Sequence, residues 1–445
     1  MPLQNRHVPI WRATRRFHYQ LDAIREILND TLPHVGALDE RHFTVDALTA
    51  IKNLPAENGE ELERYVLGQI EDAQAAQAAS GVEPEPSSTE PAPTRDGSDQ
   101  AAVRISLDLG RIEGIVGDRH FTNALIEEFE HISTGPSRVL LLHNSLLVMA
   151  VGAFEVLIGA IATRFYVQHR SALDSDEKVF TFAELREFAE VDDATDEIIS
   201  RRISDLLHGE LDQWNAWFVE VGREKFEDLA MDYEVLKEAF QRRHVIVHNG
   251  GLASRQYLQK VPDSSAQVSE RLPVDTDYLN RALDQLDTLG TALGILTEGT
   301  WNTENRDYVA NLLLRRCFEL MTERRWAAAE ALAAVGKRLK CKSVLKSSLQ
   351  CNEWLCRAEQ AGYEAVREEV SRFDTTDKAL RFELVKLVLL EEVDKALSLV
   401  PEQVRSGQIT RGELLAWPIL RRLREHEDFE QTLAHVDADA SQEID

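Results

Sequence analysis

The sequence predicts an all-α protein. Beyond about residue 101, apolar residues recur at i, i+3 and i+4, the spacing that places them on one face of a helix. Runs of β-branched residues in strict alternation, which indicate strands, are scarce. A pattern of paired helices also recurs after residue 303. We therefore expect a central helical bundle followed by stacked helical hairpins.

The first 75 residues are expected to form a short helical region. Four arginines, Arg6, Arg12, Arg15 and Arg16, precede the apolar segment LDAIREIL, and a second helix is expected over EELERYVLGQIEDA. The basic stretch has two interpretations. It is a solvated helix face, which is the commoner arrangement, or it contacts RNA.

Residues 76–100 are expected to form a flexible linker. This segment contains Pro84, Pro86, Pro91 and Pro93 and almost no large apolar side chain. Such a composition buries too little apolar surface to offset the entropy lost on ordering.

The central region, residues 101–300, has the strongest helical periodicity. Asp275 and Thr276 are candidate N-caps for its last helix. The expected helices cover residues 119–132, 138–167, 182–190, 194–208, 210–220, 230–248 and 275–297.

An apolar run inside this region raises the question of a membrane span. Leu146–Ala162 contains 17 residues with Glu155 near its middle. That length is at the short limit for crossing a bilayer, and a central carboxylate is costly there. We interpret the run as a buried core helix.

Residues 303–435 contain a weak internal repeat. Trp326, Tyr363, Val393 and Phe429 each head a similar helical block, at spacings of 37, 30 and 36 residues. Helix pairs repeating near 34 residues resemble tetratricopeptide-type solenoids, although the full consensus is absent. An irregular helical bundle is the alternative. Residues 436–445 are expected to be an acidic tail, and burial in helix packing is expected for Cys317, Cys341, Cys351 and Cys356.

The charge balance limits the classes of function. Fifty Lys and Arg face 77 Asp and Glu, a formal charge of −27, which argues against electrostatic coating of nucleic acid. The N-terminus has no apolar segment of the kind found in secretory signals, so a cytoplasmic location is expected. Walker, GxGxxG, HExxH and G-x-S-x-G motifs are absent, and we expect no cofactor and no metal.

The densest polar cluster within an apolar helix is EAFQRRHVIVHNGG, residues 238–251. The glycines after Asn249 predict the end of the helix, since glycine readily takes the left-handed conformation. Arg242, Arg243, His244 and His248 then lie in the last two turns, with the two histidines on one face. An apolar side is expected from Val235, Leu236, Ala239, Phe240, Ile246 and Val247.

These residue types suit phosphodiester chemistry. The negative end of the helix dipole favours a protonated imidazole, and histidine transfers protons in either direction near neutral pH. Arginine offers a planar fork that matches phosphate oxygens. With no metal ligands nearby, the reaction that these residues suit is attack of an RNA 2′-hydroxyl on the adjacent phosphate. DNA lacks the 2′-hydroxyl and cannot react in this way.

Arg243-x4-His248, with a polar residue directly after the arginine, resembles the R-x4-6-H motif of HEPN ribonucleases. The resemblance covers about residues 115–300, and it identifies residues 101–300 as a HEPN-like domain. It implies a helical fold, a homodimer whose two motifs form one metal-independent site, and a role as a toxin or in antiviral defence. The pair Phe154-Glu155 is similar to the family's earlier core helix, whose acidic residue can face the motif.

The R-x4-H spacing occurs four times in the sequence, so the surrounding residues must distinguish the candidate site from chance matches. Arg138/His143 and Arg164/His169 lack the polar second residue, and Arg421/His426 lies in a charged terminal helix that we expect to be solvated. Only Arg243/His248 combines a polar second residue, another histidine on the same face and a glycine stop. The alternative is a capped helix end whose His and Arg side chains bond the last carbonyls.

The residues predict an endoribonuclease that cleaves RNA, with tRNA and mRNA as candidates. His248 would be the general acid and base, Arg243 would bind the phosphate, and His244 would assist. Glu155 would orient Arg243 or His248, Asn249 would cap the helix or touch phosphate, and Arg242 would add charge. The rival is a non-catalytic scaffold that binds a protein partner through the C-terminal repeats. A third interpretation is a ribonuclease that these repeats regulate.

Overall fold

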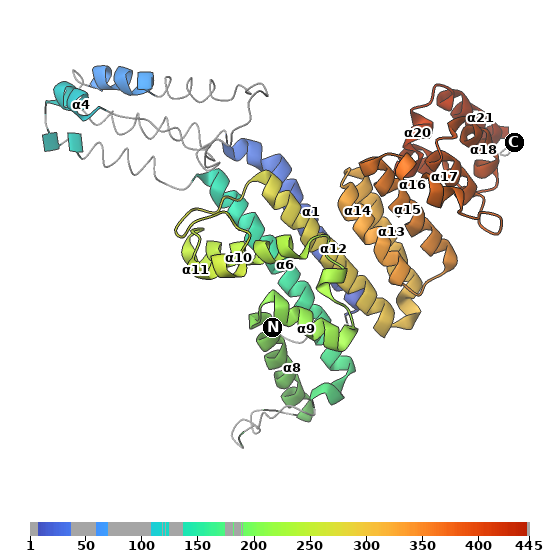
Figure 1. Ribbon diagram of the computed structural model, residues 1–445, viewed down its shortest axis with the longest axis horizontal. Helices are drawn as coiled ribbons and strands as arrows, with labels where there is room; N and C mark the ends of the chain where they lie inside the picture. Colours follow the sequence, from blue (N-terminus) through green and yellow to red (C-terminus); the bar gives the residue numbers. More distant parts are fainter. Residues whose placement is uncertain are drawn as a thin grey trace. The chain divides into compact units, whose positions relative to one another are not determined.

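The computed structural model confirms the all-α fold for the residues that it describes (Figure 1). These are residues 8–36, 59–69, 108–173 without 118, 121 and 124–136, the single residues 181 and 188, and 190–442. Within these residues the one β-type pairing is an isolated antiparallel bridge between Leu252 and Arg271. The expected linker at 76–100 lies outside them, as do most of the helices expected at 119–132 and 182–190.

The helix bounds agree with the sequence-based expectations to within a few residues. The α-helices of the N-terminal and central parts are α1 (Ile10–Glu26), α4 (Leu109–Val116), α6 (Arg138–Gln168), α8 (Val191–His208), α9 (Leu211–Gly222), α10 (Tyr233–Asn249), α11 (Arg255–Lys260) and α12 (Thr276–Trp301). Residues 59–69 are also helical. Short 3₁₀ and π turns are η1 (Ile27–Thr31), η3 (Arg170–Leu173), η4 (Phe226–Asp228) and η5 (Thr303–Asn305).

The C-terminal part continues as a series of shorter helices. They are α13 (Arg306–Thr322), α14 (Trp326–Val335), η6 (Gly336–Arg338), α15 (Ser343–Ala361), α16 (Glu364–Ser371), α17 (Arg381–Leu389), α18 (Val393–Arg405), α19 (Arg411–Ala416), η7 (Pro418–Leu420), α20 (Arg421–Arg424) and α21 (Phe429–Gln442). Because α21 runs to Gln442, the segment expected as a tail is helical over residues 436–442.

The four repeat blocks each coincide with the start of a helix. Trp326, Val393 and Phe429 are the first residues of α14, α18 and α21, and Tyr363 directly precedes α16. Helices close in sequence pack on one another (Figure 1). Helices α13, α14 and α15 contact one another pairwise, α15 then contacts α16, α16 contacts α17, α17 contacts α18, and α21 packs against α18. Stacked helix pairs are therefore the local architecture here.

The chain divides into two compact units, each assembled from several stretches. Unit 1 comprises residues 1–21, 150–240 and 281–445, and unit 2 comprises residues 22–149 and 241–280. The boundaries fall within α1, α6, α10 and α12. The division into a 101–300 domain and a 303–435 repeat region remains a prediction.

The core of unit 1 contains an aromatic cluster around Phe154 of α6. The ring of Phe154 lies 6.1 Å from Phe17, 6.2 Å from Trp214 and 5.8 Å from Phe240, measured between ring centroids. Gly290 of α12 lies against Phe17, where a Cβ would collide with the ring. Glycine at this position therefore lets α1 pack closely against α12.

Helix α6 contains the apolar run for which burial was expected. It is long and apolar enough to span a membrane, and 56% of its most apolar window is buried within the protein. Leu147, Phe154 and Ile158 are fully buried, whereas Leu141, Met149 and Val156 are exposed. Helix α6 therefore packs one side into the protein core, as expected for a core helix.

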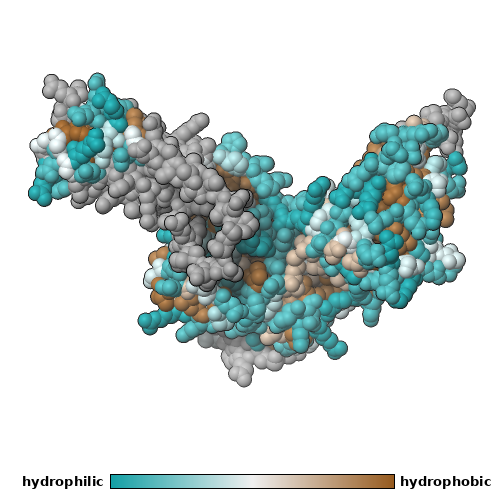
Figure 2. Space-filling view, turned by 45° about the horizontal axis from the view of Figure 1, so that its top comes forward, coloured by the Kyte–Doolittle hydropathy of each residue, from teal (hydrophilic) through white to brown (hydrophobic). Residues whose placement is uncertain are grey.

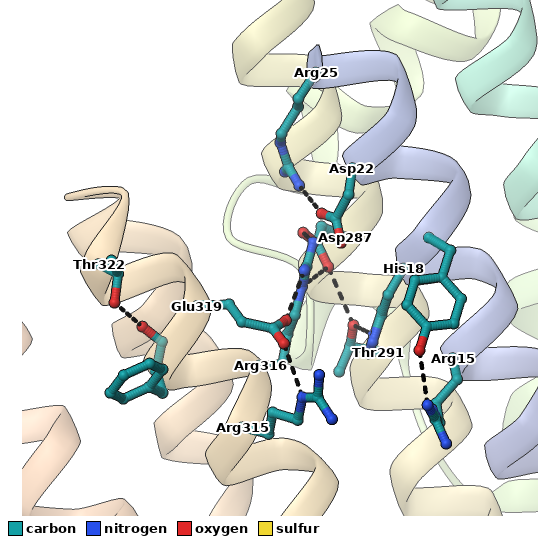
Figure 3. Close-up of polar contacts among 12 residues, drawn as sticks. Arg15, His18, Asp22, Arg25, Asp287, Thr291, Arg315, Arg316, Glu319 and Thr322 are labelled. Carbon is teal, nitrogen blue, oxygen red and sulfur yellow. Dashed lines mark hydrogen bonds and ion pairs between the residues drawn. The ribbon is translucent and has the colours of Figure 1, made fainter. Parts of the chain in front are cut away.

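A buried polar network connects three helices of unit 1 (Figure 3). Arg316 of α13 donates two hydrogen bonds to Asp287 of α12, at 2.6 Å from Nη2 and 3.2 Å from Nε. Thr291 donates its hydroxyl to Asp287 at 3.3 Å, and its oxygen lies 2.7 Å from Nε2 of His18 in α1. Because Thr291 uses its only hydrogen on Asp287, it accepts from His18, which places the proton on Nε2.

Glu298 of α12 makes a second connection to α1. Its carboxylate is fully buried and accepts hydrogen bonds from the backbone N–H of Ile10 and from the side chain of Asn305. Ile10 is the first residue of α1, so the carboxylate lies at the positive end of that helix dipole. The start of α1 is thereby fixed.

The described surface in Figure 2 is mainly hydrophilic. On the face in Figure 2, hydrophilic residues predominate and hydrophobic residues form small separate areas. An exposed apolar patch large enough to indicate a hydrophobic interface is not seen on the described part of that face.

We expect Arg316→Met to lower the free energy of unfolding by about 3–5 kcal/mol, because it leaves Asp287 as a buried carboxylate without its cation. Urea unfolding followed by circular dichroism measures this. The matched control is Arg315→Met on the same helix, whose side chain is 65% exposed against 2% for Arg316. Its surface pair with Glu319 is worth less than about 1 kcal/mol. Equal destabilisation in the two variants would contradict the role of the network.

Candidate functional site

The candidate site lies at the C-terminal end of α10, in unit 2. The helix ends as expected at the two glycines, since Gly250 and Gly251 have φ values of 60° and 81°. Leu252 N–H donates to the Asn249 carbonyl at 3.1 Å, which closes a tight turn. Two consecutive left-handed residues in such a turn favour glycine at both positions.

A small hydrophobic core packs against the buried side of this helix end. Val245 of α10 packs with Ala253, Tyr257 and Leu272, all buried. The segment after the turn pairs with residues 269–272, through bonds such as Ala253 N–H to the Glu270 carbonyl at 2.7 Å. Val247 was expected on the apolar side, but it is exposed, and Val245 takes that place.

The two histidines form a close pair on the outer face of α10. The ring centroids of His244 and His248 are 4.6 Å apart, and the rings are inclined by 48°. Both residues are exposed. The pairing follows from the i, i+4 spacing and confirms that the two rings share a face.

The two arginines have different surroundings. Arg242 donates to the carbonyl of Pro273, and its guanidinium lies 4.1 Å from the ring centroid of Tyr278. At about 100° per residue, Arg242 points about 200° round the helix from His244, so it belongs to the packing of α10. Arg243 is half-buried and lies between these two directions.

The supporting residues differ in what the structure shows. The side-chain amide of Asn249 donates to the Leu252 carbonyl, so Asn249 stabilises the turn. Glu155 is half-buried on α6 and belongs to unit 1, whereas α10 from Gln241 onward belongs to unit 2. Its pairing with Arg243 or His248 stays a prediction.

The other R-x4-H matches have structural surroundings of their own. His143 is buried and lies 3.1 Å from the Thr276 hydroxyl. The ring of His169 lies 4.9 Å from that of Phe165, measured between centroids, and the two rings are tilted by 37°. Arg421 was expected on a solvated face, but it forms a half-buried ion pair at 2.7 Å with Glu359 of α15, a residue 62 positions earlier in the chain. His426 pairs with Asp394 at 3.2 Å.

Arg271 and Tyr278 were missed in the sequence. Arg271 Nη1 donates to the carbonyl of Gly250 at 3.4 Å, which brings a third arginine to the end of α10. No motif connects it with residue 243, and only the chain reversal at Gly250-Gly251 brings them together. Over residues 242–271 there are five Lys and Arg against two acids, so this stretch is locally cationic.

The four cysteines belong to unit 1, whereas the candidate site at the end of α10 belongs to unit 2. Cys317, Cys351 and Cys356 are buried, and burial raises the pKa of the Cys351 thiol to about 12. This confirms packing roles for these three, whereas Cys341 is half-buried. Among the described residues, no group of three or more His, Cys, Asp or Glu is placed to hold a metal ion.

No protein-family model, curated protein or solved structure matches the chain.

We expect His143 to contribute acid sensitivity. Burial lowers the pKa of His143 below its ordinary value of 6.5, with Asp275 acting in the opposite direction. The unfolded chain therefore binds more protons than the folded protein as pH falls through 6.5, and the free energy of unfolding decreases. The decrease is measured by urea unfolding at pH 7.5 and 5.5.

His143→Gln retains a polar partner for Thr276 but does not titrate, so it should lose less stability over the same interval. His169→Gln removes an exposed histidine and should behave as the wild type does. If His143→Gln and the wild type are destabilised by the same amount, the buried imidazole is not the cause.

Proposed function

We propose that the protein is a metal-independent endoribonuclease of the HEPN type, acting as a toxin or antiviral-defence effector. The observation that carries this proposal is the exposed His244–His248 pair beside Arg243 at the end of α10. The negative, C-terminal end of a helix dipole favours cationic side chains, and it is these side chains, not the helix end itself, that would bind an anionic phosphate.

The proposed reaction is an internal transfer of the phosphoryl group. The 2′-oxygen forms a bond to phosphorus as its proton moves to the neutral imidazole of His248. The bond from phosphorus to the 5′-oxygen breaks, and that oxygen takes a proton from an imidazolium. The products are a 2′,3′-cyclic phosphate and a 5′-hydroxyl end. Arg243 stabilises charge on the phosphate oxygens as the bonds exchange.

His244 fits as the assisting group. A ring 4.6 Å from His248 is close enough to donate the second proton or to position the first ring. The transfer requires one neutral imidazole to accept the 2′-proton and one imidazolium to protonate the 5′-oxygen, and two adjacent histidines provide a group for each role.

A homodimer is part of the proposal because the family resemblance implies a site composed of two motifs. Two copies of the α10 end would bring further positive charge to one phosphate. Light scattering at working concentration tests this. A strictly monomeric protein that still cleaves RNA would contradict a composite site.

We expect the wild type to cleave RNA in excess EDTA and to leave cyclic phosphate and 5′-hydroxyl ends. His248→Ala should slow cleavage about 10²–10⁴-fold through loss of acid–base catalysis. Arg243→Ala should slow it about 10²–10³-fold through loss of charge stabilisation. Sequencing of RNA ends beside a gel assay of a labelled RNA measures both.

The matched controls are Arg164→Ala on α6 and His169→Ala directly after its end, which remove the same residue types at the same spacing. They should leave the cleavage rate unchanged. Activity that disappears with metal removal, or that survives both Arg243→Ala and His248→Ala, refutes this mechanism.

A second candidate function is a non-catalytic scaffold that binds a protein. An open cavity of about 300 Å³ lies on α18 and α21, lined by Asp394, Leu397, Pro401, Asp428 and His435 among others. Its acidic and apolar lining suits a segment that carries Lys or Arg.

This rival predicts that purified protein cleaves no RNA but binds a Lys/Arg-rich peptide in calorimetry. Asp394→Lys with Asp428→Lys should abolish that binding, and Glu402→Lys with Glu430→Lys should preserve it. RNA cleavage that disappears in His248→Ala would exclude a purely structural role.

A further inference from the structure

The outward face of α1 in unit 1 carries a mixed surface of arginine and aromatic side chains. Arg12, Arg15, Arg16 and Tyr19 recur at i, i+3, i+4 and i+7, so they share one face of the helix. The opposite face is the core face, where Ile10, Phe17 and Leu21 are buried. The exposed residues of α1 are therefore not needed for packing within unit 1.

Aromatic rings extend this face. Trp11 packs edge-on against Tyr308 of α13, with 4.8 Å between ring centroids. The Arg12 guanidinium lies 5.2 Å from the Trp11 ring, and Arg15 donates to the Tyr19 hydroxyl at 2.7 Å (Figure 3). Tyr19 is 58% exposed and Tyr308 is 41% exposed. Tyrosine and tryptophan side chains are enriched at binding interfaces, because they combine a large apolar ring with a polar group.

The charge of this face is opposite to that of the chain. From Ile10 to Leu21, α1 contains Arg12, Arg15 and Arg16 and no acid, although the protein as a whole has a charge of −27. On α13, Asp307 beside Tyr308 is paired with Lys342, whose Nζ lies 3.1 Å from the carboxylate. The acid adjacent to the rings thus has its own cation.

We propose that this face, comprising Trp11, Arg12, Arg15, Arg16, Tyr19 and Tyr308, binds single-stranded nucleic acid. Guanidinium groups bind phosphate oxygens, and exposed rings stack on unpaired bases. In a duplex the bases already stack on one another, so the rings select a single strand. The proposal does not depend on the ribonuclease activity proposed above, because it involves different residues and no chemistry.

A membrane surface fits this face less well. A helix that lies on a bilayer inserts its apolar face, and in α1 that face is buried in the core. An acidic peptide would pair with the arginines but would leave Tyr19 and Tyr308 without a stacking partner. Both remain outcomes of the test.

The test measures fluorescence anisotropy of the full-length protein with labelled 20-mers at several salt concentrations. A 2′-O-methyl RNA is the first probe, because it lacks the hydroxyl that the proposed cleavage needs and stays intact. A DNA strand of the same sequence separates RNA from DNA as the source of the single strand. We expect binding of the single strand at lower protein concentration than of the matched duplex.

Two sets of variants test the charges and the rings separately. Arg12→Gln with Arg16→Gln should weaken binding and lower the salt slope by about 1.4, because each arginine bound to a phosphate contributes about 0.7 to the slope on a single strand. The matched control, Arg372→Gln with Arg405→Gln, removes the same charge from exposed sites at the ends of α16 and α18 and should leave binding unchanged. Tyr19→Leu should weaken binding about fivefold or more, and Tyr19→Phe, which retains the ring, should bind within about twofold of the wild type.

Four results would overturn the proposal. They are absence of binding to both single strands at low salt, equal affinity for duplex and single strand, equal weakening by the two arginine pairs, and stronger binding to phosphatidylserine vesicles or polyglutamate than to RNA. Failure of RNA cleavage would not bear on it, since the 2′-O-methyl probe is never cleaved.

Discussion

The buried ion pair between Asp287 and Arg316 is the constraint on which the arrangement of helices in unit 1 depends. A carboxylate and a guanidinium away from water are tolerated only when each satisfies the other, because either one alone carries a large desolvation cost. The pair therefore requires α12 and α13 to hold a fixed register. Thr291 and His18 extend the requirement to α1, a helix some 270 residues earlier in the sequence. A polar network of this kind defines one arrangement more sharply than apolar contacts do, since a shift by one turn would leave several polar groups without partners.

Helix α12 combines polar and steric demands in one segment. Its acids Asp287 and Glu298 bind α13 and the start of α1, and Gly290 removes the Cβ that would collide with Phe17. These residues lie at three- to eleven-residue intervals and serve different neighbours. Glycine in a helix interior costs about 1 kcal/mol relative to alanine. Gly290 therefore shows that close packing against α1, not helix propensity, determines the residue at this position of α12.

Features that depend on local chemistry were predictable from the sequence, and features that depend on chain reversal were not. Asp275 caps α12 by accepting from the Tyr278 N–H, and Gly250 and Gly251 end α10, as their residue types indicate. The heads of the repeat blocks also coincide with helix starts. By contrast, Arg315 and Arg316 are identical neighbours in sequence, and only the position of Asp287 decides which one is buried. The different surroundings of Arg242 and Arg243 could not be predicted from the sequence for the same reason. Arg242 contacts Pro273 and Tyr278, which lie near it only because the chain reverses after α10.

Net charge is a poor guide to what an all-α chain of this size can bind. Screening at physiological salt confines exposed charges to a range of about 8 Å, so a ligand responds to the side chains near it and not to the total. In this protein the acids are unevenly distributed. Residues 1–21 contain none, and residues 242–271 contain two against five cations. In these stretches Arg12 and Arg16 on α1 and His244 and His248 on α10 are exposed, whereas the core sides of both helices are buried. Acidic surface outside these stretches would increase selectivity for where nucleic acid binds. It repels the phosphates everywhere except where local cations outnumber acids.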